Sequence, residues 1–398
     1  MKFIMLVADG MADYPVMEMQ GRTPLQVAEH PNIDALVRGG IIGTVSTVPD
    51  GMDANTDVAF LSLLGYDPRE YHAGRGALEA INRGIELSGD EVAFRFNLIR
   101  EEGGLLKDYA AGHISTEDAG LLVKALSESL GSEDVRFYAG VSYRHILVLN
   151  GYSEKVHCYA AHDVVGKPIR DLWVTAEEVE AQDTADLLNA LIVGSKTVLA
   201  GHRLTRDGKT SANMIWPWGP GKKPAFPTLN QRYGIGGAVI SAVDVVNGLG
   251  LFTGMDVITV PGATGFIDTN YEGKADYALE ALKTHDFVLV HVEAPDEAGH
   301  LGDHGLKVKT IEDLDRRLLG RLLAGLKDKY TIAVLPDHPT PTTVRTHTRD
   351  PVPFVIYSSE KPTLNRLRSF SEASARDSGL RVERGCEFID FFFDYGRG

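Results

Sequence analysis

The chain has 398 residues, of which 43% are hydrophobic and 24% are charged, proportions typical of a globular protein with one large or two medium domains. Its 55 acidic residues outnumber its 40 basic residues, and the resulting net charge of −15 argues against general binding to nucleic acid. The sequence contains no run of about 18 apolar residues, which is the length that a membrane-spanning helix needs, so we expect no membrane span. Cys158 and Cys386 lie too far apart in sequence to suggest a disulfide framework or a cysteine metal site. We therefore expect a cytoplasmic protein, and the sequence leaves its oligomeric state open.

The apolar residues 3–8 predict a strand that ends at Asp9 and Gly10. An acidic residue at the C-terminal end of a parallel strand lies where α/β sheets place ligands, although an Asp-Gly pair is also a common turn. The pattern then predicts a helix capped by Thr23 with Pro24 in its first turn, a short helix over 32–40 and a strand over 41–48.

Thr56 lies where a polar loop changes into an apolar helical pattern that begins at Val58. One interpretation is a helix cap, which would contribute about 1 kcal/mol of stability. The other is a hydroxyl nucleophile at a helix N-terminus, where the helix dipole and the free N–H groups favour an incoming phosphate. Ser62 is a poorer candidate for the nucleophile because it lies about two turns into the apolar helix.

The composition changes in the middle of the chain, where arginines, histidines, glycines and prolines punctuate short mixed elements. This change predicts a smaller α/β or α+β domain inserted at 76–234 into a core formed by 1–75 and 235–398. Its clearest helix is predicted over 177–196. Gly208-Lys209-Thr210 is not a nucleotide-binding P-loop, because Arg203 occupies the position of the first glycine.

After residue 236 the strand and helix patterns alternate again. We expect helices over 238–248, 274–284 and 306–327, and strands over 256–260, 286–292, 331–338 and 352–357. The apolar run 286–292 is followed by Asp296 and His300. In a helix these two side chains share one face and could clamp a metal ion. The alternative is an N-cap aspartate and a surface histidine.

Three predicted strands thus end in side chains that bind metals: Asp9, Asp296 with His300, and the pair Asp337-His338, which His347 follows on the next loop. The carboxyl ends of parallel strands meet at one edge of a sheet, so we expect these groups to lie together. Each position has an ordinary structural explanation, but their agreement in place and chemistry favours a site. Carboxylates and imidazoles in this number suit two divalent metals such as manganese, zinc or magnesium.

Several stretches carry a resemblance to a known family. They are Val7-Ala8-Asp9-Gly10, Thr56-Asp57-Val58-Ala59, Leu63-Leu64-Gly65-Tyr66-Asp67-Pro68, Val292-Glu293-Ala294-Pro295-Asp296-Glu297-Ala298-Gly299-His300, Pro336-Asp337-His338-Pro339-Thr340-Pro341, His347-Thr348 and Asp350-Pro351-Val352-Pro353-Phe354. With them the chain resembles the alkaline phosphatase superfamily and, within it, the archaeal-type cofactor-independent phosphoglycerate mutases. The matching stretches run along nearly the whole chain.

The resemblance implies an α/β fold of the alkaline phosphatase type: a three-layer sandwich with a mostly parallel central sheet, and an inserted cap domain. It implies two divalent metal ions, with manganese as the first choice. Asp296, His300 and His347 would bind one ion. Asp9, Thr56, Asp337 and His338 would surround the other. The family pattern gives Glu293 no role, and we expect it in a second shell, where it would orient a ligand.

The implied reaction interconverts 3-phosphoglycerate and 2-phosphoglycerate through a phosphothreonine at Thr56, in glycolysis and gluconeogenesis. The inserted domain would close over the site and exclude water. The cap residues that could bind the substrate's carboxylate and phosphate are His113, Arg144, Lys222 and Lys223, although a surface salt bridge is the alternative for each one.

The family pattern usually has serine where this chain has Thr56, and the additional methyl group narrows the geometry of attack. Two further activities stay open. Residues 109–116 and 161–168 look more like a branch of the family proposed to act as homoserine kinases. A metal-dependent phosphatase, with water as the acceptor, is the third reading, and a non-catalytic metal-binding protein is the least compatible with the ligand set.

Overall fold

The structure, a computed structural model, describes residues 1–71, 74–223, 227–363 and 366–397. The chain divides into two compact units, one formed by Met1–His72 with Ala225–Gly398 and the other by Ala73–Pro224. The second unit ends earlier than the predicted 76–234, because α9 (Leu229–Tyr233) belongs to the first. There the hydroxyl of Tyr66 donates to the carbonyl of Pro227 at 2.6 Å, and Arg232 donates to the carbonyl of Gly65. The role of the second unit as a cap stays a prediction.

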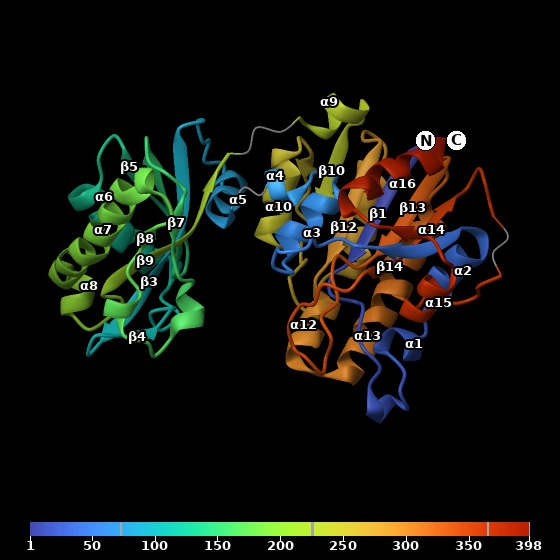
Figure 1. Cartoon of the computed structure of the whole chain (residues 1–398), viewed down its shortest axis with the longest axis horizontal. Coiled ribbons are helices and arrows are strands. Elements are labelled where there is room, and N and C mark those ends of the chain that lie inside the picture. Colours follow the sequence, from blue (N-terminus) through green and yellow to red (C-terminus); the bar gives the residue numbers. More distant parts are fainter. Residues whose placement is uncertain (72–73, 224–226, 364–365, 398) are drawn as a thin grey trace. The chain divides into compact units, whose positions relative to one another are not determined.

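The first unit is built on an eight-stranded sheet (Figure 1). In spatial order its strands are β11 (Asp256–Val257), β10 (Gly237–Ile240), β12 (Phe287–Val292), β1 (Lys2–Ala8), β13 (Tyr330–Leu335), β14 (Val352–Ser358), β2 (Ile41–Val45) and β15 (Arg381–Val382). All pair in parallel except β14, which runs antiparallel to both β13 and β2. The central strands are continuous apolar runs because helices cover both faces of the sheet. The predicted mostly parallel sheet is confirmed.

Successive side chains of β1 point to opposite faces of the sheet, and helices cover each face. Ile4, Leu6 and Ala8 belong to the same buried cluster as residues of α2 (Pro31–Gly39), α11 (Tyr271–Ala281), α13 (His304–Asp313) and α15 (Glu372–Asp377). On the opposite face, the ring of Phe3 packs against Phe392 and Phe393 of α16 (Phe388–Arg397). Helices α3 (Thr56–Leu63) and α10 (Asp244–Phe252) cover the same opposite face. The layers are therefore helix, sheet and helix, as predicted.

Most of the remaining helices of the first unit pack in the layer that contains α2, because they contribute Leu25, Ala294 and Leu322 to the same buried cluster. The remaining helices are α1 (Pro24–Val27), α4 (Pro68–Tyr71), α12 (Ala294–Leu301) and α14 (Gly320–Gly325), with a π-helical turn at Leu314–Leu319 between α13 and α14. Thr23 caps α1 as predicted, since its hydroxyl accepts from the N–H of Gln26. The predicted helix over 238–248 is wrong in its first half. Residues Gly237–Ile240 form β10, which lies between β11 and β12, and the helix begins only at Asp244.

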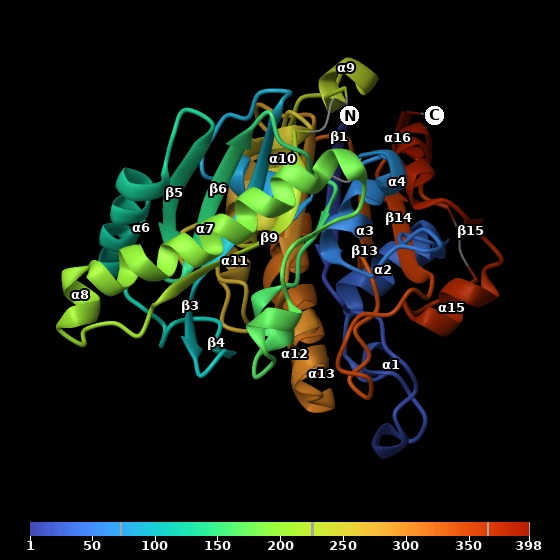
Figure 2. The same cartoon turned by 60° about the vertical axis from the view of Figure 1, so that its left-hand side comes forward.

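The second unit contains an antiparallel sheet centred on β3 (Glu91–Glu102). Its other strands are β4 (Leu105–Asp108), β5 (Val135–Val141), β6 (Arg144–Asn150) and β9 (Met214–Lys222), and β7 (Val156–His157) pairs separately with β8 (Thr175–Ala176). Helices α6 (Thr116–Leu130) and α7 (Gln182–Gly201) pack along one face of the sheet (Figure 2). The helix predicted over 177–196 begins and ends five residues later, because a 3-10 turn precedes it. The short helices are α5 (Arg75–Asn82) and α8 (Arg203–Arg206).

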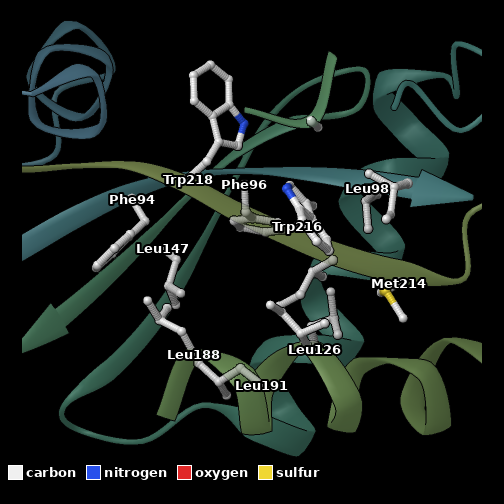
Figure 3. Packing of buried hydrophobic residues seen from close by; sticks show 14 of the residues in the cluster. Phe94, Phe96, Leu98, Leu126, Leu147, Leu188, Leu191, Met214, Trp216 and Trp218 are labelled. Atoms are coloured by element: carbon white, nitrogen blue, oxygen red, sulfur yellow. The ribbon is translucent and has the colours of Figure 1, made fainter. Parts of the chain in front are cut away.

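The core of the second unit lies between its sheet and α6 with α7. Phe94, Phe96 and Leu98 alternate along β3 and point toward Leu126 and Leu188 of the helices (Figure 3). Trp218 projects from the other side of the sheet (Figure 3). That side carries the polar residues of β3, as described below. Within the described residues of both units, no helix has the length and apolar character that crossing a membrane requires.

Candidate functional site

The predicted ligands come together because three neighbouring parallel strands end at the same edge of the sheet. β1 pairs with β12 through Ala8 and Val292, and with β13 through Val7 and Leu335. Asp9 therefore follows the central strand of the three, and the segments after β12 and β13 flank it. This arrangement is the one expected for a ligand site in an α/β sheet.

The first ligand group is formed around Asp296, which lies in α12 and is buried. Nε2 of His300, one turn later, lies 3.1 Å from its Oδ2, and Nε2 of His347 lies 3.5 Å from its Oδ1. Burial would raise the pKa of Asp296, but hydrogen bonds with the two histidines hold it well below the usual value. Asp296 in turn raises the pKa of His300 to about 9. The helix N-cap is Glu293, so the alternative of Asp296 as a cap is wrong.

The second ligand group contains Asp9, Asp337 and His338, whose side chains are fully buried. Nε2 of His338 lies 3.6 Å from Oδ1 of Asp9 and 3.2 Å from Oδ2 of Asp337. Oδ1 of Asp337 accepts from the N–H groups of Gly10 and His338, which fixes the orientation of the carboxylate. His338 also lies within reach of Asp296 and His347, so the two groups share a border.

Thr56 is the first residue of α3, and its Oγ1 lies 3.4 Å from Nε2 of His338. The N-cap position belongs to Asn55, which makes no side-chain capping bond, so the interpretation of Thr56 as a cap is wrong. Ser62 is buried inside the same helix, in agreement with its rejection as a nucleophile. The structure thus brings together all seven residues predicted for the metal site and the nucleophile.

The side chains of the second group suit divalent cations. Oδ1 of Asp9 and Oδ2 of Asp337 are buried and have no hydrogen-bond partner among the described residues. Burial raises the pKa of Asp9 well above its usual value, and the neighbouring carboxylates of Asp337, Glu293 and Asp296 raise it further. Buried carboxylates that repel one another are stabilised by a proton or by a bound cation, and the imidazole nitrogen and carboxylate oxygens that converge here suit a cation. Oxygen and imidazole donors together fit manganese, zinc or magnesium.

Sequence reasoning missed His291, which lies within the apolar strand β12. Its Nε2 lies 2.8 Å from Oδ2 of Asp9, and its Nδ1 lies 2.9 Å from Oγ of Ser241. Glu293, expected in a second shell, lies 3.3 Å from the same Nε2, and burial raises its pKa to about 8. The buried Lys274 donates to the carbonyl of His291 at 2.6 Å. The one sequence feature that could have revealed His291 is the presence of a histidine within an otherwise apolar strand.

Close packing holds the loops of the site together. The hydroxyl of Thr340 donates to Oδ1 of Asp296. Gly10 has a φ of +60°, and a Cβ atom there would lie 2.5 Å from Oδ1 of Asp296 and 2.6 Å from Oγ1 of Thr340. The Asp-Gly pair is therefore more than a turn, because the glycine makes room for a predicted ligand.

The four residues predicted to bind substrate fall at two separate places in the second unit. His113 and Arg144 both lie beside the ring of Tyr143, at 6.0 Å and 5.8 Å. Arg144 pairs with Asn97 in the middle of β3, whereas Lys222 pairs with Val92 near the start of that strand.

Lys222 forms an ion pair with Glu154 at 3.1 Å, and Lys223 is exposed at the end of β9. The contact of Lys222 with Glu154 therefore fits the alternative interpretation, a surface salt bridge.

Arginines that were not predicted to bind substrate lie near Arg144, since burial and the charges of Arg75 and Arg144 lower the pKa of Arg95. The guanidinium groups of Arg95 and Arg75 lie 4.8 Å and 5.4 Å from the centre of the Trp218 ring. Arg95 is buried and its Nη1 bonds Glu79 at 2.7 Å. Four buried nitrogen atoms of this cluster lack hydrogen-bond partners within the described residues: Nε of Arg83, Arg95 and Arg144, and Nε2 of His145. Such a surplus of buried donors and positive charge suits an anionic ligand.

The chain is similar to known proteins over nearly its whole length. The family description "Metalloenzyme superfamily" matches residues 1–380. A 2,3-bisphosphoglycerate-independent phosphoglycerate mutase of Methanosarcina barkeri is 46% identical over 397 residues, which cover 98% of each chain. A protein of Geobacter sulfurreducens, named a probable enzyme of the same kind, is 45% identical over 99% of this chain and all of its own.

Two solved structures are similar over nearly the full length. The cofactor-independent phosphoglycerate mutase of Thermoplasma acidophilum has a TM-score of 0.70 at 29% identity and covers 99% of both chains. The PH0037 protein of Pyrococcus horikoshii has a TM-score of 0.83 at 29% identity, with 99% of this chain and 96% of its own covered.

Proposed function

The chain belongs to the metalloenzyme superfamily and, within it, to the 2,3-bisphosphoglycerate-independent phosphoglycerate mutases, and from this premise we propose that it interconverts 3-phosphoglycerate and 2-phosphoglycerate. In the cell this reaction belongs to glycolysis and gluconeogenesis. The observation that carries the proposal is the position of the Thr56 hydroxyl, at a helix N-terminus and 3.4 Å from Nε2 of His338. His338 is the residue at which the two groups of candidate metal ligands meet.

We propose two divalent metal ions, with manganese as the first choice. Asp296, His300 and His347 would hold one, and Asp9, Asp337 and His338 would hold the other beside Thr56. Ions in these positions supply charge stabilisation for a transferring phosphoryl group and lower the pKa of a nearby hydroxyl. The unpaired buried oxygens of Asp9 and Asp337 support this assignment.

Thr56 would act as the nucleophile. Its Oγ1 loses the hydroxyl proton and forms a bond to phosphorus while the bond from phosphorus to the glycerate oxygen breaks. The departing oxygen takes up a proton, which yields a phosphothreonine and bound glycerate. The N–H groups in the first turn of α3 lie beside this oxygen and favour the negative charge of the phosphoryl group. The other hydroxyl of glycerate then attacks the phosphothreonine. Glycerate must stay bound and water must stay out, because water as acceptor would release inorganic phosphate.

For substrate recognition we propose the arginine cluster of the second unit. Arg75 and Arg95 lie over the ring of Trp218, and Arg144 is close enough to Arg95 for the two charges to interact. Glu79 offsets only part of this positive charge. Guanidinium groups bind carboxylates and phosphates through paired hydrogen bonds. His113 remains a candidate at the rim of this cluster, whereas Lys222 is already paired with Glu154.

A phosphorus NMR assay separates the proposed reaction from its rivals. The metal-loaded chain is incubated with 3-phosphoglycerate without bisphosphoglycerate, and in parallel with homoserine and ATP. We expect 2-phosphoglycerate in the first reaction and no phosphohomoserine in the second. Phosphohomoserine would favour the homoserine kinase reading, which the names of the relatives do not favour. Inorganic phosphate as the main product would indicate a phosphatase.

A further inference from the structure

A buried lysine of α13 bonds both of the loops that carry the aspartates of the second ligand group. Lys307 is fully buried, and its ammonium group makes three hydrogen bonds. It donates to the carbonyl of Ala12 at 3.1 Å, to Oδ2 of Asp13 at 2.9 Å and to the carbonyl of Thr340 at 2.8 Å. All three protons of the ammonium are therefore used.

The residues that Lys307 contacts lie close in sequence to the proposed metal ligands. Ala12 and Asp13 follow Asp9 on the loop after β1, and Thr340 follows Asp337 on the loop after β13. The first loop is thereby tied to the second, because the ammonium bonds carbonyl oxygens of both.

Direct contacts between the same loops complete the arrangement. The N–H of Thr340 lies 3.3 Å from the carbonyls of Gly10 and Ala12, and the N–H of Thr342 donates to the carboxylate of Asp13. The hydroxyl of Thr340 donates to Asp296 of the first ligand group. The ammonium group of Lys307 therefore supports two loops that carry ligands of the second group, and one of these loops also contacts Asp296 of the first group.

The pair of Lys307 and Asp13 is not explained by stability. Removing two charges from water costs several kcal/mol for each ion, and well-packed apolar residues often stabilise a core as well or better. A buried pair that is fully hydrogen-bonded does, however, fix one arrangement of the segments that it joins. The glutamate Glu372 extends this network, since its carboxylate accepts from the N–H of Asp13 and from the hydroxyl of Thr23.

We infer that Lys307, together with Asp13, is a positioning residue that sets the spacing of the metal-binding carboxylates Asp9 and Asp337. This inference rests on the proposed metal centre. It assigns to Lys307 no contact with substrate or metal. Its effect is on the arrangement of the two loops, and hence on the affinity of the site for a divalent cation.

The test is the binding of Mn²⁺ to the metal-stripped full chain, measured by calorimetry at a temperature at which circular dichroism shows each variant to be folded. Lys307→Met is expected to weaken Mn²⁺ binding by about tenfold or more, as loss of residues that support ligands commonly does. Asp13→Asn keeps the size of the side chain but places an amide beside the ammonium, and it should weaken binding in the same direction. If Lys307→Met does not fold, the Mn²⁺ affinity of Asp13→Asn alone tests the positioning role.

The matched control is Asp315→Ala. Asp315 is likewise fully buried and joins two segments, because its carboxylate accepts from the N–H groups of Asn32 and Ile33 at the start of α2. Helix α2 carries none of the proposed ligands, so this variant should lower the melting temperature and leave Mn²⁺ affinity within about twofold of the wild type.

Three outcomes overturn the inference. Wild-type affinity in both Lys307→Met and Asp13→Asn would show that the pair has no influence on the site. Equal weakening in Asp315→Ala would show a general effect of lost stability. A wild-type chain that binds no Mn²⁺ would remove the proposed metal centre itself, which distinguishes a failure of the proposed function from a failure of the positioning role.

Discussion

Oγ1 of Thr56 lies 3.4 Å from Nε2 of His338, although 282 positions separate the two residues in the chain. The helix α3 delivers the hydroxyl at its first residue, and the loop after β13 delivers the imidazole. A threonine held there without a capping role, beside a candidate metal ligand, is placed for nucleophilic chemistry.

Thr56→Ala should reduce the rate of mutase turnover by at least about a thousandfold, because no other hydroxyl replaces the nucleophile. The metal content, measured by plasma emission, should not change, since the carboxylate and imidazole ligands remain. Thr56→Ser is the matched control. It keeps the hydroxyl and removes only the methyl group, so activity should persist. A Thr56→Ala enzyme with more than a tenth of wild-type activity would remove Thr56 from its role.

Asp337→Asn should lower the affinity for Mn²⁺ by about tenfold or more, because the substitution removes a buried charge from the ligand group. The amide can keep the contacts that Oδ1 makes with the N–H groups of Gly10 and His338, so the loop should stay folded. The exposed Asp328→Asn is the control for the loss of one negative charge. Equal metal stoichiometry and affinity in both variants would count against Asp337 as a ligand.

Arg144→Met should raise the KM for 3-phosphoglycerate by roughly ten- to a hundredfold, the range expected when one charge-assisted hydrogen bond is lost. Steady-state kinetics at saturating Mn²⁺ measures the change. Arg206→Met removes an exposed arginine of the same unit and should leave the KM unchanged. A similar KM in the two variants would mean that the arginine cluster does not bind the substrate.

The stability of the second unit should fall in acid because of His145. Burial, with Arg83 and Arg95 nearby, lowers the pKa of His145 to about 3, whereas an unfolded histidine has a pKa near 6.5. The unfolded chain therefore binds the proton first, and the stabilisation present above about pH 6.5 is lost as the pH falls toward 3. The loss should approach about 1.4 kcal/mol per pH unit.

The measurement is urea unfolding between pH 7 and pH 5, followed by tryptophan fluorescence. All three tryptophans, Trp173, Trp216 and Trp218, lie in the second unit and report on it. His145→Gln removes the titrating group but can still accept from the N–H of Gly140, as Nδ1 does now. It should show a flatter pH dependence. The same slope in both proteins would assign the acid sensitivity to other groups.

The ligand set could be predicted from sequence because each group follows an apolar run at a predictable strand end. The position at a strand end was enough to predict Asp9, Asp337 and His338 as ligands. The prediction of Asp296 with His300 also used their spacing of four residues in a helix. His291 was not predicted, because its neighbours in sequence form an ordinary apolar strand. Nothing in the sequence shows that its ring faces Asp9.

Long-range pairing accounts for the remaining errors. The strand β10 is too short to show an alternating pattern, so its apolar residues merged with the helix that follows. The direction of β14 was not predicted, because it depends on partners far away in the chain. In the second unit, the pairing along β3 places Lys222 away from Arg144, and no local signal announces that separation.

The most direct test of the account is a titration of the metal-stripped chain with Mn²⁺, in the presence of 3-phosphoglycerate and without bisphosphoglycerate, with 2-phosphoglycerate formation as the readout. We predict no turnover without metal and a rate that rises to saturation as two ions bind per chain. Formation of 2-phosphoglycerate by the metal-free chain, or none by the metal-saturated chain, would contradict it.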